Sequence, residues 1–134
     1  MNDYKKKLTA LNLKSKPIFD IEDHLKYTKD WRGQYIGDAI AILKPHDKYE
    51  VSKILKFAND NEISIVPQGG NTSLCGGATP LKNSFSIIIS TEKMNNIISI
   101  DKESMTITLE PGVILSIIHE QVEKNDLFFP LSLG

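Results

Sequence analysis

Residues 66–80 combine two glycine pairs with small hydroxyl and amide side chains, directly after an apolar run. Glycine tolerates positive φ and lets a ligand approach the main chain, so backbone N–H groups here could point at an anion. Side-chain donors lie between the two glycine pairs. The pattern predicts a loop that holds a phosphate-bearing cofactor. Its glycines are Gly69, Gly70, Gly76 and Gly77, and its donors are Asn71, Thr72 and Ser73.

Neither of the two common nucleotide-binding motifs fits this loop. No Gly-Lys-Ser/Thr triplet follows it, and its glycine spacing differs from the dinucleotide pattern G-x-G-x-x-G. A different kind of cofactor loop is needed if the segment binds phosphate. The alternative is that each glycine pair simply forms a tight turn in a surface loop.

The whole string PQGGNTSLCGGATP resembles the first FAD-binding loop of the FAD-linked oxidases, which share the vanillyl-alcohol oxidase fold. The closer likeness is to the D-2-hydroxyacid dehydrogenase branch, which includes D-lactate and D-2-hydroxyglutarate dehydrogenases and the glycolate oxidase FAD subunit. The similarity extends from about Asp30 to the end of the chain. The other segments that carry it are 30–37 (DWRGQYIG), 39–45 (AIAILKP), 90–97 (STEKMNNI), 109–113 (LEPGV) and 129–134 (FPLSLG).

The resemblance implies FAD as the cofactor and assigns expected roles within the loop. The segment 69–73 would surround the pyrophosphate, Pro67 and Gln68 would shape the loop, and Gly76 and Gly77 would form its return. Pro130 and Leu131 would line the flavin side. Some flavoenzymes of this fold attach FAD through a histidine in this loop; Asn71 stands at the comparable place here. Non-covalent FAD is therefore expected.

The chain also departs from the family pattern, because relatives continue into a second glycine-rich FAD contact and a substrate domain. The resemblance thus implies the N-terminal part of an enzyme that oxidises a D-2-hydroxy acid to a 2-oxo acid. Three hypotheses remain open. In the first, the chain is part of a working FAD oxidoreductase that is completed by a missing segment or a second polypeptide. In the second, it is an FAD-binding module without activity of its own. In the third, it is a relic that binds nothing. We assign no catalytic residue, and the substrate stays open.

Composition is that of an ordinary globular domain: 134 residues, 40% hydrophobic, 25% charged, with a net charge of −1. This near-neutral charge gives no reason to expect nucleic acid as a partner. Cys75 is the only cysteine, which excludes an internal disulfide and favours a reducing compartment. No apolar run reaches the roughly 20 residues of a membrane span, and no signal core opens the chain. A cytoplasmic protein is expected.

The apolar pattern predicts an α+β fold with a small parallel βαβ-type first FAD-binding subdomain, flanking helices and the start of a second α+β subdomain. A short amphipathic helix is expected around Tyr4, Leu8 and Leu11, and another helix or turn over 19–27. Buried strands are expected at 39–43 and 63–66. The helix between them, 47–61, has Asp47 and Glu50 as a capping pair and is long enough for a right-handed parallel crossover.

Further along the chain, a third strand is expected at 85–90 and a hairpin from 97–100 and 105–109. A second amphipathic helix follows over 113–124, with Leu115, Ile118 and Val122 on one face. We divide the chain into a helical segment, 1–29, and the start of an FAD-binding domain, 30–134.

Three histidines and a single arginine complete the candidate chemistry. The histidines lie far apart in sequence, without a paired ligand, so no metal site is predicted and each is interpreted as a polar surface group. Arg32 is explained equally well by a surface salt bridge and by a structural or substrate-side role. The residues concerned are His24, His46, His119 and Arg32.

Overall fold

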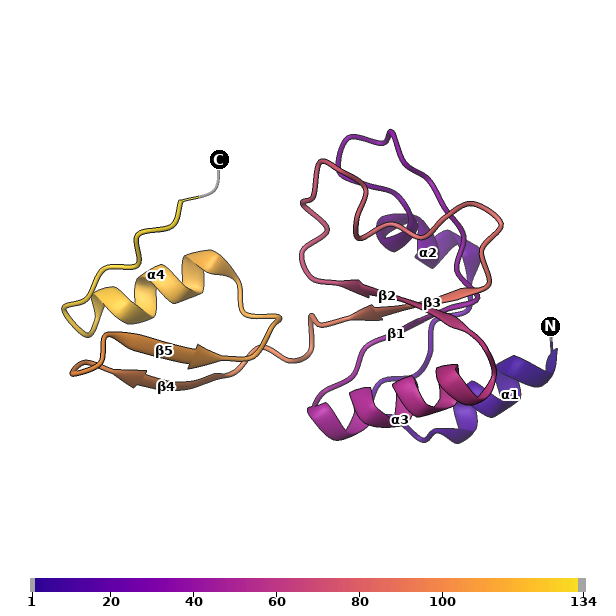
Figure 1. Cartoon of the computed structure of the whole chain (residues 1–134), viewed down its shortest axis with the longest axis horizontal. Helices are drawn as coiled ribbons and strands as arrows, with labels where there is room; N and C mark the ends of the chain where they lie inside the picture. Colours follow the sequence, from indigo (N-terminus) through magenta and orange to yellow (C-terminus); the bar gives the residue numbers. More distant parts are fainter. Residues whose placement is uncertain (1, 133–134) are drawn as a thin grey trace.

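The computed structural model describes residues 2–132, which form two lobes joined by a short connection (Figure 1). The larger lobe holds three helices and a three-stranded sheet, and the smaller lobe holds a hairpin and one helix. In chain order the elements are α1 (Asn2–Ala10), α2 (Ile21–Thr28), β1 (Ala41–Leu43), α3 (Lys48–Asp60), β2 (Ser64–Gln68), β3 (Ser86–Ser90), β4 (Ile97–Asp101), β5 (Thr106–Leu109) and α4 (Leu115–Glu123).

The sheet of the larger lobe is parallel, with strand order β1-β3-β2. β3 lies in the centre and is buried along its whole length, as a run of apolar residues in a doubly covered sheet should be. The expectation of a buried strand at 63–66 is wrong for most of β2. This strand is at an edge of the sheet, so only Gln68 of its five residues is buried.

Helices cover both faces of this sheet, with α1 and α3 on one face and α2 on the other (Figure 1). Because side chains alternate along a strand, neighbouring residues of β3 face different cores. Ile87 packs with Leu8 and Ile54, whereas Ile88 packs with Tyr27. Both N-terminal helices therefore contribute to the cores of the parallel sheet. The division at residues 29/30 stays a prediction.

Helix α3 begins as the sequence predicted, with Asp47 at its N-cap. The Asp47 carboxylate accepts hydrogen bonds from the backbone N–H groups of Tyr49 and Glu50, both at 2.9 Å. The expected reciprocal capping by the Glu50 side chain is not observed. Its carboxylate instead accepts from the backbone N–H groups of His46, at 2.8 Å, and Lys14, at 2.6 Å, and so ties the N-terminal segment to the helix.

The smaller lobe is an antiparallel hairpin covered by α4, which confirms the expected start of a second α+β unit. The Asp101 carboxylate accepts from the N–H groups of Glu103 and Ser104 and closes the turn between β4 and β5. Ile118 and Val122 are the buried residues of α4. The two lobes meet where the N–H of Gly112 donates to the Met94 carbonyl oxygen at 2.8 Å.

Candidate functional site

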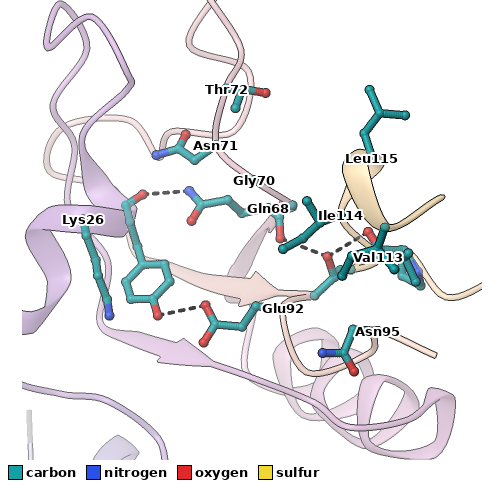
Figure 2. A pocket seen from close by; sticks show the side chains of 16 residues that line it. Lys26, Gln68, Gly70, Asn71, Thr72, Glu92, Asn95, Val113, Ile114 and Leu115 are labelled. Carbon is teal, nitrogen blue, oxygen red and sulfur yellow. Dashed lines mark hydrogen bonds between the residues drawn. The ribbon is translucent and has the colours of Figure 1, made fainter. Parts of the chain in front are cut away.

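A cavity of about 890 Å³ lies at the carboxyl ends of β2 and β3 and extends to the beginning of α4 (Figure 2). Ligands of open parallel sheets commonly bind at this end of the strands. The predicted glycine loop leaves β2 directly and forms one wall of the cavity. The sequence-predicted residues that line it are Gln68, Gly69, Gly70, Asn71 and Thr72.

The other six predicted residues lie outside the lining of this cavity. Pro67 is an exposed residue of β2, and Ser73 accepts a hydrogen bond from the Cys75 N–H at 3.2 Å. The exposed C-terminal pair is tied to α4, because the Leu131 carbonyl oxygen contacts His119 Nε2 at 2.8 Å. The six residues are Pro67, Ser73, Gly76, Gly77, Pro130 and Leu131. Leu133 and Gly134, the last two residues of the family-like segment 129–134, lie outside the described residues.

Two residues of the loop take the left-handed backbone conformation, and only one of them is a glycine. Among the four loop glycines, Gly76 alone has a left-handed φ, +68°, and it lies against the Tyr35 ring, which a side chain would meet. Asn71 supplies the other left-handed position in the loop, with a φ of 53°. Asparagine tolerates this conformation better than most residues do, so part of the loop's turn comes from an amide residue.

Gly69 and Gly70 are exposed, and their surroundings within the protein leave room for a side chain. A Cβ atom on Gly69 would come no nearer than 4.0 Å to Thr91, and one on Gly70 no nearer than 3.8 Å to Thr72. The fold itself therefore does not require glycine at these two positions. Since both line the cavity, the missing side chains leave space for a ligand to approach the backbone.

The backbone of this loop also offers unused donors. Within residues 2–132, the N–H groups of the five consecutive residues 69–73 make no hydrogen bond. Successive free N–H groups in a turn form a favourable site for an anion such as phosphate. The residues present therefore fit the diphosphate of a dinucleotide.

Hydrogen bonds hold this loop against the rest of the larger lobe. Gln68 Nε2 donates to the backbone carbonyl oxygens of Tyr27 and Ala78, each at 2.8 Å. Asn71 Nδ2 donates to the carbonyl oxygen of Lys29 at 2.8 Å. Both amides thus act inward, on the protein, and fix the start of the loop to the C-terminal end of α2 (Figure 2).

Sequence reasoning missed the opposite wall of the cavity. Apolar side chains of the β5–α4 connection and the start of α4 form it, and polar residues after β3 complete the floor. One polar wall and one apolar wall suit a ligand that carries both phosphates and an aromatic ring. The family-like segments 90–97 and 109–113 were the signal that could have found this wall. Its residues are Thr91, Glu92, Asn95, Pro111, Gly112, Val113, Ile114, Leu115 and Ile117, with Lys26 and Tyr27 from α2.

Glu92 is the single carboxylate in this lining and has several partners. Its oxygens contact Lys44 Nζ at 2.9 Å and accept from the Tyr27 hydroxyl at 3.1 Å and the Ser90 hydroxyl at 3.3 Å. Burial alone would raise the pKa of Glu92. The hydrogen bond and charge of Lys44, with the two hydroxyl donors, outweigh burial and hold this pKa below its ordinary value.

The interpretation as a polar surface group is wrong for one of the three histidines. His24 is buried, with Nε2 at 3.0 Å from the Ile18 carbonyl oxygen. His46 contacts the Ser15 hydroxyl at 2.7 Å. Arg32 is exposed. In the part of the chain that the structure describes, no group of three or more His, Cys, Asp or Glu residues could hold a metal ion.

Comparison with known proteins identifies the class to which this fold and loop belong. A family model described as "FAD binding domain" matches residues 39–134, and the chain belongs to this family. FAD is accordingly its cofactor class, as the resemblance implied.

Individual relatives refine this assignment. The chain is 40% identical over 105 residues to a probable mitochondrial D-2-hydroxyglutarate dehydrogenase of Oryza sativa subsp. indica, covering 78% of the chain and 18% of the relative. It is equally similar to a putative mitochondrial D-lactate dehydrogenase of Schizosaccharomyces pombe, covering 78% and 20%. These relatives confirm the predicted D-2-hydroxyacid dehydrogenase branch. The chain spans about a fifth of their length.

A solved structure supports the same fold. Substrate-bound p-cresol methylhydroxylase matches with a TM-score of 0.79 and 25% sequence identity, over 99% of this chain and 26% of that one. This match confirms the vanillyl-alcohol oxidase-type fold and the α+β class predicted from sequence. No helix within residues 2–132 is long and apolar enough to span a bilayer.

Proposed function

We propose that this chain is the FAD-binding portion of an oxidoreductase that converts a D-2-hydroxy acid to a 2-oxo acid, with FAD held non-covalently. The observation that carries the proposal is the loop at 69–73, whose five backbone N–H groups make no hydrogen bond within residues 2–132 and whose residues 69–72, with two unobstructed glycines, line the cavity. The printed names of its relatives, which include D-2-hydroxyglutarate and D-lactate dehydrogenases, support the substrate class.

In this proposal the loop residues divide the work of binding. The backbone of 69–73 donates to the diphosphate, while Gln68 and Asn71 hold the loop in place through their bonds to the end of α2. Pro67 shapes its start, and Gly76 and Gly77 form its return. The apolar wall at 113–117 shields the ligand from water. Pro130 and Leu131 are assigned to the flavin side.

FAD, when bound, supplies the acceptor for the hydride removed from the α-carbon of the hydroxy acid. Protein groups must orient that acid and accept its hydroxyl proton, and we assign no residue of this chain to either task. We propose that these groups come from further polypeptide, either continuous with this chain or a second subunit. The relatives, of which the matched region is only about a fifth, support this division.

The test is retention of flavin by the purified 134-residue chain after mixing with FAD and desalting. Non-covalent binding predicts that heat releases the retained flavin intact. Replacing Gly70 with Val should abolish retention, because the side chain would enter the space above the loop backbone. Gln34→Leu is the control, because Gln34 is exposed and lies outside the cavity lining, and it should leave retention unchanged. Equal retention by wild type and Gly70→Val would reject the loop assignment.

The alternative is an FAD-binding module without activity of its own. In the described residues, the charged side chains that line the cavity are Lys26 and Glu92, and Glu92 is already paired with Lys44. This scarcity of free charged groups favours a binding role for the described chain. A second polypeptide that supplies the second glycine-rich segment separates the two hypotheses. If the chain is part of an oxidoreductase, adding this polypeptide should give dye reduction with a D-2-hydroxy acid. If the chain is only a binding module, no dye reduction should appear. A cytoplasmic location stays a prediction; cell fractionation tests it against the mitochondrial location named for both relatives.

A further inference from the structure

Two lysines lie over the ring of Tyr27, a residue that lines the cavity. Lys26 Nζ is 5.0 Å from the ring centroid, and Lys44 Nζ is 5.3 Å from it. Both distances fall within the range of cation–π attraction. Lys26 and Tyr27 line the cavity and follow one another near the C-terminal end of α2. Figure 2 labels Lys26 on this helix.

The charge of Lys44 is already compensated. Its ammonium group contacts a Glu92 oxygen at 2.9 Å, and the other Glu92 oxygen accepts from Tyr27 and Ser90. Burial would lower the pKa of Lys44, but its bonds to Tyr27 and Glu92 outweigh burial and raise it, so this lysine remains charged at neutral pH. The pair Lys44–Glu92 therefore adds no net charge to the cavity.

The charge of Lys26 is not compensated in this way. Lys26 forms no ion pair with any residue in 2–132, although Glu22 and Asp23 lie one turn earlier on the same helix. Lys26 and Glu92 are the charged side chains of the cavity lining in the described chain. With Glu92 neutralised, the cavity carries one unmatched positive charge.

We propose that Lys26 pairs with a phosphate group of the flavin nucleotide held by the 69–73 loop. The inference rests on the proposed function and adds an ionic contact to the backbone donors. Lysine suits this task because its ammonium is a compact charge on a flexible stem and its three N–H donors can follow a phosphate oxygen. The Lys26 ammonium group lies over the Tyr27 ring, and both residues line the same cavity as Gly69 and Gly70.

The test compares binding of FAD, ADP and riboflavin to wild type, Lys26→Gln and Lys26→Arg at low and high salt, by calorimetry on the full chain. Lys26→Gln should raise the Kd for FAD and ADP about two- to fivefold at low salt, as expected for a solvent-accessible ion pair. High salt should remove most of this difference. Binding of riboflavin, which has no phosphate, should not change, and Lys26→Arg should restore FAD affinity.

Lys48→Gln is the matched control, because Lys48 Nζ lies 5.3 Å from the ring of the next residue, Tyr49, away from the cavity. It should leave FAD binding unchanged. An unchanged FAD affinity in Lys26→Gln, or an equal loss for riboflavin, would overturn the inference while the proposed function stands. If wild type binds none of the flavins, the proposed function itself fails.

Discussion

Gln68, the last residue of β2, donates a hydrogen bond from Nε2 to the backbone carbonyl oxygen of Tyr27 in α2, at 2.8 Å. The same nitrogen donates to the carbonyl oxygen of Ala78, also at 2.8 Å. One buried amide thus joins the end of an edge strand, the helix on one face of the sheet, and the returning part of the glycine loop. The start of the loop is held from three directions.

Gln68→Leu should destabilise the protein by about 1–3 kcal/mol, because two carbonyl oxygens lose their donor in a largely buried place. The free energy of unfolding in urea measures this effect. FAD affinity should fall as well, since the loop loses its anchor. Gln34→Leu is the control: Gln34 is exposed, and its change should stay within about 0.5 kcal/mol. A Gln68 variant as stable as this control would contradict the bracing role.

Gly112→Ala should destabilise the junction between the lobes. An added Cβ would lie 2.8 Å from the Met94 carbonyl oxygen and would also clash with the backbone of Thr91. Neither neighbour is a flexible side chain, so the connection must shift, at a cost of about 3 kcal/mol. Thermal unfolding measures the loss. Gly77→Ala, with open space around its Cβ, should change stability little; a similar loss in both variants would argue against the clash.

The ion pair of Glu92 and Lys44 predicts a specific dependence of stability on pH. Because the folded-state pKa of Glu92 lies below its ordinary value of 4.5, the pair stabilises the protein above that pH, and its contribution disappears as the pH falls below it. The Glu92 side chain is 40% exposed, so the contribution is at most about 1 kcal/mol.

Glu92→Gln should therefore lose stability at neutral pH and lose less than wild type on acidification. Urea unfolding at several pH values gives both quantities. Glu123→Gln, at the exposed end of α4 and without an ion pair in the described chain, is the control. If the free energy of unfolding depends on pH in the same way in wild type and in Glu92→Gln, the ion pair contributes nothing.

Asp47→Ala should cost about 1 kcal/mol, because the carboxylate caps α3 with two hydrogen bonds at 2.9 Å. Its contact with Lys14 at 3.2 Å is lost too, but this exposed pair adds little. Asp20 occupies the N-cap of α2 without any side-chain capping bond. Asp20→Ala should therefore cost distinctly less in the same unfolding experiment, and equal losses would contradict the capping role.

The elements of this fold could be predicted from local patterns because each has a clear period or a clear boundary. The alternating hairpin and the capped helix α3 are examples, and the loop after β2 stood out by its glycines. The exposure of β2 could not be predicted in this way, since it depends on strand order. β3 follows β2 in the chain yet lies between β1 and β2.

Only one side of the site could be predicted, because the other side depends on how distant segments meet in the fold. The phosphate side is a continuous stretch of sequence, but the opposite wall comes from segments 20 to 45 residues further along. Lys26 carries no signal in the sequence, because it differs from Lys44 only in three dimensions: Lys44 pairs with Glu92, whereas Lys26 forms no ion pair within residues 2–132. The positive φ of Asn71 was also missed, since this residue was interpreted as a side-chain donor.

Asn71 holds a left-handed backbone conformation and is tied through its amide to Lys29. Because this bond forms when the lobe folds, the loop loses much of its conformational entropy before any ligand arrives. Ligand binding then needs little further ordering of the backbone, and the site is preorganised. Warming that loosens the contact between Asn71 and Lys29 should consequently release cofactor at temperatures where the parallel sheet is still intact.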